Sequence, residues 1–239
     1  NTIDTNNKNI KQYTSFASLN YTWNDEHNYE EYIASKQFII ENNLLAGINM
    51  DKNKNIYVSV PRWKSGVPAT LNKLVLGLDN NATDTNEKYL LEPFPSWEMQ
   101  REGVQGDLQN VQSMTIDNNN IMWVIDVGRR NFFETGINSN PIDAPASIIK
   151  IDLNIATKNT ANAANTNTNQ YTYVYKDPII DSYTFNEDIV SYNNSFLNDI
   201  VVDTDRNGKS ISYIYIYYYP TLYTLSVYIC TLYTLTNPI

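Results

Sequence analysis

Alternating apolar and polar positions recur at three places along the chain, in residues 47–60, 112–125 and 198–208. Each of the first two copies has an alternating run, a polar turn led by Asp, and a second run rich in branched and aromatic side chains; the third copy opens in the same way. Alternation with a period of two is typical of half-buried strands, and Asp or Asn suits a tight turn. We therefore expect two strands joined by a tight turn at each copy.

A companion element also recurs, in residues 68–74 and 145–151. Pro68 and the two prolines within 92–95 break helices and place loops between strands. The polar, Asn-rich stretch 156–170 is expected to be an exposed loop. One unit repeated at long, irregular intervals suggests a blade architecture.

The two ends of the chain depart from this pattern. Residues 1–37 are polar and aromatic, and we expect a lead-in with a short helix near 29–36. Residues 211–239 carry no charge and are crowded with Tyr, Thr, Leu and Ile. Three interpretations of this tail are open: a membrane span, which Pro220 makes marginal; a β-strand pair, suggested by the alternation at 213–217; and translated non-coding sequence after a broken reading frame. We favour the third.

Composition narrows the class of protein. The length of 239 residues allows one large β domain or two smaller ones, and the net charge of -9 argues against nonspecific nucleic-acid binding. Cys230 is the only cysteine, which excludes an internal disulfide and a cysteine metal cage. The lone His27 is predicted to be a surface residue, and no motif of a nucleophilic triad, zinc hydrolase or phosphate-binding loop occurs. Residues 203–208 imitate a calcium loop, but its twelfth position is Ile214 rather than Glu, so we interpret them as a turn.

Six blocks of sequence, in order, resemble one known family. They are residues 33–43, 60–71, 95–99, 108–113, 122–129 and 196–203. The most specific block is the string Pro-Arg-Trp-Lys-Ser-Gly-Val-Pro-Ala-Thr-Leu at 61–71. On these blocks the chain is similar to the major royal jelly protein/yellow family. The resemblance implies a secreted, six-bladed β-propeller with a ligand channel along its axis. Family members differ in function: some bind aromatic biogenic amines, and some insect members resemble a dopachrome tautomerase in activity. Others are storage or pigmentation proteins.

The repeats account for about two blades and the start of a third. We therefore predict an all-β chain with a partial six-bladed β-propeller at 38–209, after the lead-in at 1–37 and before a tail at 210–239 that is not part of the fold. An open propeller exposes sheet edges, so self-association through blade edges is expected. Animal members often carry a Cys just before the block at 106–109, and this chain has none there, so any disulfide that uses it is lost.

The resemblance also places a candidate site. In propellers, residues that enter the innermost strands line the channel, and the related six-bladed lactonases and phosphotriesterases hold calcium with Asn and Asp there. Asn198 and Asp199 lie at such a place, and Asn49 and Gln112 are predicted to take the comparable positions of the first two copies. These four residues are our predicted ligand-binding set, in which amides bond a polar ligand and Asp199 pairs with an ammonium group. The alternative is that they only satisfy strand ends and trapped water.

The block at 61–71, the signature block, also contains side chains that could contact a ligand. Arg62 or Lys64, beside Trp63, could cap a ligand ring through a cation–π contact. We expect a structural role instead, with Trp63, Trp97 and Trp123 packed between blades, because aromatic side chains supply much of the buried area between sheets.

The expected function is a secreted, extracellular protein that binds a small aromatic or biogenic-amine ligand. The alternatives are an enzyme, either a dopachrome-type tautomerase or a calcium-dependent lactonase, and a truncated gene product without function. No catalytic residue is assigned and no cofactor is expected, with calcium as the alternative. The expected partners are a small molecule and, through sheet edges, further copies of the chain, rather than a nucleic acid or a membrane. Extracellular location follows from the resemblance alone, since no signal peptide is visible.

Overall fold

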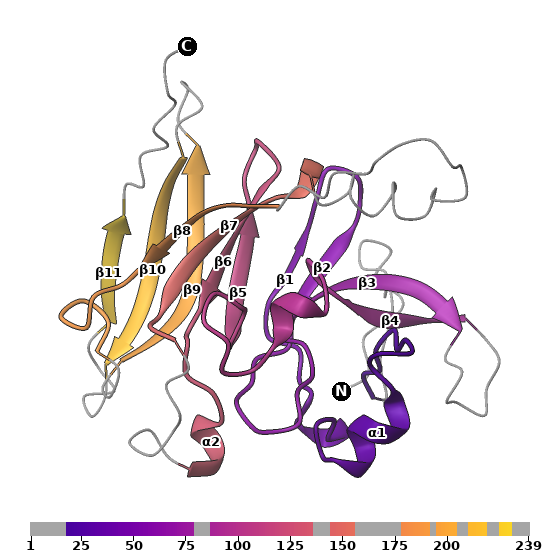
Figure 1. Cartoon of the computed structure of the whole chain (residues 1–239). Helices are drawn as coiled ribbons and strands as arrows, with labels where there is room; N and C mark the ends of the chain where they lie inside the picture. The colour runs from indigo at the N-terminus through magenta and orange to yellow at the C-terminus, as the bar shows by residue number, and fades with distance from the viewer. Residues whose placement is uncertain are drawn as a thin grey trace, which may run out of the picture.

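The computed structural model describes residues 18–78, 87–135, 144–155, 178–191, 195–204, 210–218 and 225–230. The predicted loop at 156–170 and the centre of the predicted turn at 203–208 lie outside these ranges. Within the described ranges the chain forms three antiparallel sheets and a few short helices (Figure 1). The predicted all-β class is confirmed.

The first copy of the repeat opens a four-stranded sheet. Its strands, in spatial order, are β1 (Ile48–Met50), β2 (Ile56–Ser59), β3 (Leu71–Leu78) and β4 (Glu87–Pro93). The turn between β1 and β2 forms as predicted, because the Asp51 carboxylate accepts the backbone N–H groups of Asn53 and Asn55, both at 2.8 Å. The companion element supplies β3.

The second copy forms another four-stranded sheet with the same plan. Its strands are β5 (Val111–Ile116), β6 (Ile121–Asp126), β7 (Ser147–Asp152) and β8 (Ile179–Thr184). Asp117 repeats the turn chemistry and accepts the N–H groups of Asn119 and Ile121 at 2.8 and 3.0 Å. The positive φ angles of Lys54 and Asn120, 69° and 64°, close the two turns in the same way.

The third copy forms a three-stranded sheet. Its strands, in spatial order, are β11 (Leu225–Cys230), β10 (Ser210–Tyr218) and β9 (Ser195–Thr204). Of the three interpretations of the tail, the strand pair is the one that the structure forms. The expected domain boundary at residue 210 falls between two strands that pair with each other, from Ser210 opposite Thr204 to Tyr218 opposite Ser195. The three-domain division and the foreign origin of the tail stay predictions.

Helices are short and lie in connections. They are α1 (Tyr29–Ala34), the 3-10 turns η1 (Ile40–Asn42) and η2 (Glu98–Gln100), and α2 (Phe132–Thr135). α1 confirms the helix expected in the lead-in, and the Asn28 side chain caps it by accepting the N–H groups of Glu30 and Glu31. In the described part of the chain, no helix has the length and apolar character needed to cross a membrane.

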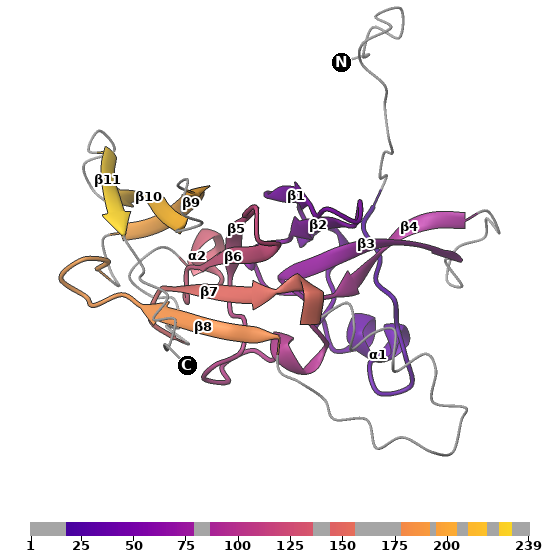
Figure 2. The ribbon, with the colours of Figure 1, turned by 90° about the horizontal axis from the view of Figure 1, so that it is seen from above.

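The second strands of the first two sheets, β2 and β6, are buried on both faces. In β2, Tyr57 packs with the second sheet, whereas its neighbour Val58 packs with the lead-in. In β6, Met122 and Val124 face the first sheet, whereas Trp123 and Ile125 pack with residues of the third. The middle sheet is therefore packed between the other two, and β5 lies between β9 and β1 (Figures 1 and 2).

The lead-in covers the remaining face of the first sheet. Its Tyr21 is buried, forms a bridge with Leu91 of β4, and donates its hydroxyl to Asn43 at 2.7 Å. Trp97 packs here, stacked at 5.7 Å against Trp23 and at 4.3 Å against His27. The prediction that Trp97 packs between blades is wrong, because its aromatic partners come from the lead-in.

Candidate ligand site where the first strands of the sheets meet

The opening strands of the three sheets lie side by side. Ser59 Oγ of the first sheet donates to the backbone oxygen of Gln112 in β5 at 3.0 Å, and it accepts the Gly47 N–H at 2.7 Å. Ser113 Oγ, also in β5, donates to Asp199 Oδ1 in β9 at 2.7 Å. A row of hydrogen bonds therefore joins the inner edges of all three sheets.

Strand register shows which positions of the three copies are equivalent. Asn49 pairs with Tyr57, and Thr115 pairs with Trp123. Tyr57 and Trp123 are themselves equivalent, because each donates to the carboxylate of its own turn, Asp51 or Asp117. The predicted equivalence of Asn49 with Gln112 is therefore wrong by three residues, and Asn49 corresponds to Thr115.

Gln112 and Asn198 do occupy equivalent positions. Each lies at a β-bulge, where the pairing skips one residue: from Val111 to Ser113 in β5 and from Leu197 to Asp199 in β9. A bulge changes the direction in which the following side chains point. It lets Val111 and Met114 both reach the core between the first two sheets, and it turns Ser113 and Asp199 toward each other.

Asp199 is the exposed charged residue at the place where β5 and β9 meet. Its Oδ1 accepts two hydrogen bonds, from Ser113 Oγ at 2.7 Å and from the Ile200 N–H at 2.9 Å. These donors fix the carboxylate, while Oδ2 has no partner within the part of the chain that the structure describes. An oriented carboxylate with a free oxygen can accept from an ammonium or hydroxyl group.

Gln112 is buried and is held by the signature block. Its Oε1 accepts the indole N–H of Trp63 at 2.9 Å. Trp63 packs edge-on against Phe133, at 5.5 Å between ring centres. This confirms that Trp63 connects the first two sheets, and it leaves Asn49, whose Oδ1 accepts its own neighbour's N–H, outside the row.

Aromatic rings extend from Trp63 to the third sheet. Phe133 contacts Phe132 at 4.2 Å, and Phe132 contacts Phe196 of β9 at 4.9 Å between ring centres. Phe133 is 60% exposed. We call the set Trp63, Gln112, Ser113, Phe132, Phe133, Phe196, Asn198 and Asp199 the junction arc. It combines accessible aromatic surface with one oriented carboxylate.

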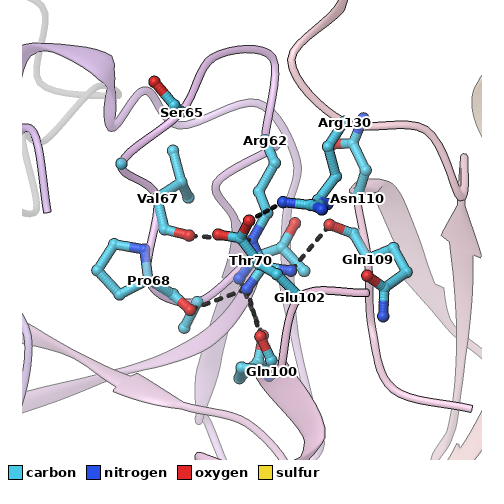
Figure 3. Close-up of polar contacts among 12 residues, drawn as sticks. Arg62, Ser65, Val67, Pro68, Thr70, Gln100, Glu102, Gln109, Asn110 and Arg130 are labelled. Carbon is cyan, nitrogen blue, oxygen red and sulfur yellow. Dashed lines mark hydrogen bonds and ion pairs between the residues drawn. The ribbon is translucent and has the colours of Figure 1, made fainter. Parts of the chain in front are cut away.

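Arg62 has no part in this arc, because it is 1% exposed and its donors are fully used. Its guanidinium donates to five backbone oxygens at 2.5–2.9 Å (Figure 3). The acceptors are those of Val67, Pro68, Gln100, Leu108 and Gln109. Glu102 lies 3.6 Å from Arg62 Nε and also pairs with Arg130. Arg62 therefore has the structural role that we expected. It connects the loops of the first sheet to the segment that leads into the second sheet.

Position 66 in the same block has no room for a side chain and therefore requires glycine. Its φ is +78°, and a Cβ atom there would lie 2.5–2.8 Å from atoms of Ile39. The block 61–71 is thus a structural connection, with Trp63 as its contact to the arc.

Two cavities lie away from the arc, beside the lead-in. One, of about 430 Å³, is lined by Trp23, Trp97, Lys73 and Glu92 among others; the second, of about 480 Å³, is lined by residues 18–19 and 40–45. Among the described residues no group of three or more His, Cys, Asp or Glu side chains could hold a metal ion. His27 packs on Trp97, and Asn24 Oδ1 lies 3.1 Å from His27 Nδ1, where it accepts a hydrogen bond when that nitrogen carries the proton.

Of the residues predicted from the sequence, Gln112, Asn198 and Asp199 lie where the opening strands meet, and their role in ligand binding stays a prediction; Ser113 and Gly47 were not predicted. These two residues are equivalent to Asp199, because Gly47 pairs with Ser59 and Ser113 with Ile125 at the same place in their sheets. Alignment on the turn residues Asp51, Asp117 and Asp203 would have found both.

Fold and site together define an antiparallel β protein in which successive sheets are joined at their inner strands. No model of a protein family matches the chain. The chain is 29% identical over 136 residues to Protein yellow of Drosophila yakuba, and 28% identical over 136 residues to Protein yellow of Drosophila melanogaster. It is 32% identical over 127 residues to the dopaminechrome tautomerase of Drosophila melanogaster.

These matches confirm the resemblance to the yellow family. They cover 52–55% of this chain. The chain spans about a quarter of the length of the curated relatives that it matches, with 24–25% of each relative covered.

Proposed function

We propose that this chain supplies part of a yellow-type β-propeller that is secreted and binds a small aromatic amine at the junction arc. Each sheet packs face to face with the next and presents its opening strand to a common inner side, which is the arrangement of propeller blades. The similarity to yellow proteins supports the same architecture.

The observation that carries the proposal is the oriented carboxylate of Asp199. An ammonium group bound to Oδ2 would form a charge-assisted hydrogen bond, and the rings of Phe132 and Phe196, which contact each other in the same arc, offer an apolar face for an aromatic ligand. Gln112 and Asn198, at the two bulges, add amide groups that bond hydroxyl groups of such a ligand.

Calorimetric titration of the full chain with dopamine and serotonin tests this proposal. We expect saturable heat for the unmodified chain and at least about tenfold weaker binding for Asp199→Asn, because the amide removes the charge and keeps the shape. Asp188→Asn is the matched control, since Asp188 is an exposed carboxylate in the turn before β9. The absence of heat, or equal binding by Asp199→Asn, would overturn the proposal.

A second candidate function is a tautomerase, which the 32% identity to dopaminechrome tautomerase favours. A tautomerase needs a group that accepts and returns a proton, and Asp199 is the exposed, oriented carboxylate of the arc. Following the absorbance of dopaminechrome with the full chain distinguishes this function from binding alone. Turnover that Asp199→Asn abolishes and Asp188→Asn retains would establish it, whereas ligand heat without turnover would leave binding as the function.

A further inference from the structure

The cavity of about 430 Å³ beside the lead-in is a second place where a small molecule can bind. Its walls come from β2, β3 and β4, from the lead-in at 22–24 and from residues 95–98 after β4, and it shares no lining residue with the junction arc. Ligand pockets in proteins measure roughly 300–1,000 Å³. The cavity therefore has room for a small metabolite.

Two opposite charges stand side by side in the cavity wall. Lys73 of β3 and Glu92 of β4 both line the cavity, and they lie directly opposite each other in the two strands. Side chains in such positions have Cβ atoms about 4.5–5.5 Å apart. Even so, neither forms an ion pair or a hydrogen bond within the described ranges, and both are half-buried. Each charge is therefore available to a ligand.

Aromatic rings surround this charged pair. Tyr57 and Phe94, in edge-on contact at 4.8 Å between ring centres, line the cavity from the first sheet. Trp23 and Trp97, with ring centres 5.7 Å apart, line it from the segments beside the sheet, and both are half-buried. A ligand held by the charged pair would contact aromatic surface as well, which favours a ligand with a large apolar or aromatic group.

We propose that this cavity binds a free α-amino acid with an aromatic or large apolar side chain. An α-amino acid carries its carboxylate and its ammonium group on one carbon atom, so both groups reach two side chains that stand opposite each other in neighbouring strands. The carboxylate accepts from Lys73 Nζ and the ammonium group donates to the Glu92 carboxylate, each in a charge-assisted hydrogen bond.

The pair of charges excludes simpler ligands. A plain amine at Glu92 would place its positive charge beside that of Lys73, and a plain carboxylate at Lys73 would place its negative charge beside that of Glu92. Each would meet one like charge, whereas a zwitterion matches both. The site does not rest on the proposed function, because Asp199 and the junction arc take no part in it.

Calorimetric titration with three ligands of one shape tests the proposal. The ligands are L-phenylalanine, phenethylamine, which lacks the carboxylate, and 3-phenylpropionate, which lacks the ammonium group. The full chain with Asp199→Asn is used, so that amine binding at the junction arc does not contribute to the heat. We expect saturable binding of L-phenylalanine and at least about tenfold weaker binding of the other two, because each loses one charge-assisted hydrogen bond.

Variants of the charged pair give the second readout. Lys73→Met and Glu92→Gln should each weaken the binding of L-phenylalanine at least about tenfold. Lys52→Met and Glu31→Gln are the matched controls, because both remove exposed charges outside the cavity, and they should keep it.

The comparison of the three ligands is made on one chain, so it does not depend on whether a cavity variant folds. The absence of heat with L-phenylalanine, equal binding of the three ligands, or undiminished binding by Lys73→Met would each overturn the proposal. Failure here would leave amine binding at the junction arc untouched, since that function is tested by Asp199→Asn.

Discussion

The two junctions between neighbouring sheets are built differently. Between the first and second sheets, Arg62 is surrounded by five carbonyl oxygens, and Ser59 and Trp63 both bond to Gln112. Between the second and third sheets, Ser113 bonds to the exposed carboxylate of Asp199. At the first junction the side chains of Arg62, Trp63 and Gln112 bond within the chain, whereas at the second junction the Oδ2 atom of Asp199 has no partner among the described residues.

This difference indicates that the first junction is structural and that the second is the one expected to bind a ligand. A buried polar group that is fully bonded stabilises one arrangement of the chain, and it has nothing left with which to bind a ligand. At the second junction, one Asp199 oxygen lies at the surface and can accept a hydrogen bond from a ligand. Ligand chemistry is therefore expected at the second junction, although the signature block lies at the first.

The largest effect is expected from Arg62→Met. The change leaves five buried carbonyl oxygens without their donor and should lower the free energy of unfolding by about 3–5 kcal/mol. Urea unfolding measures it. Arg101→Met, which removes the 60% exposed partner of Asp107, should cost far less, because solvent screens an exposed ion pair. Similar losses for the two variants would show that the first junction does not depend on Arg62.

A smaller effect at the same junction is expected from Gly47→Ala. The new Cβ atom would lie 2.9 Å from Ser59 Oγ and 3.3 Å from the Ser113 Cα atom, so β1 and β5 must separate slightly. Overpacking of this kind costs about 1–3 kcal/mol. Gly77→Ala is the matched control, because its nearest contact is a flexible Leu90 methyl at 3.3 Å. Equal stability of the two variants would contradict the close approach of β1 and β5.

Much of the fold was predictable because its signals are local. The Asp51 and Asp117 turns bond to N–H groups two and four residues away, so the hairpins follow from short stretches of sequence. Trp97 could not be placed in this way, because its partners Trp23 and His27 lie about 70 residues earlier in the chain. An aromatic residue in the sequence predicts burial, but it does not identify the element against which the side chain packs.

The site could be predicted only in part, because the strand register decides which residues of the three copies are equivalent. Gln112 and Asn198 could be recognised as polar residues at strand entries, but the equivalent residue of the first copy is Ala46, which has no polar side chain to draw attention. Asn49 was chosen instead, and it lies three residues further along. The bonds of Arg62 to three separate segments depend on tertiary packing and leave no pattern in the sequence.

A double-mutant cycle on Ser113→Ala and Asp199→Asn measures the second junction directly. The bond between them lies at the surface, so we expect a coupling energy of about 0.5–1.5 kcal/mol, well below the loss from Arg62→Met. Ser113→Ala should also weaken amine binding, because Asp199 loses one of the donors that orient it. A coupling energy near zero would mean that β5 and β9 do not depend on this bond.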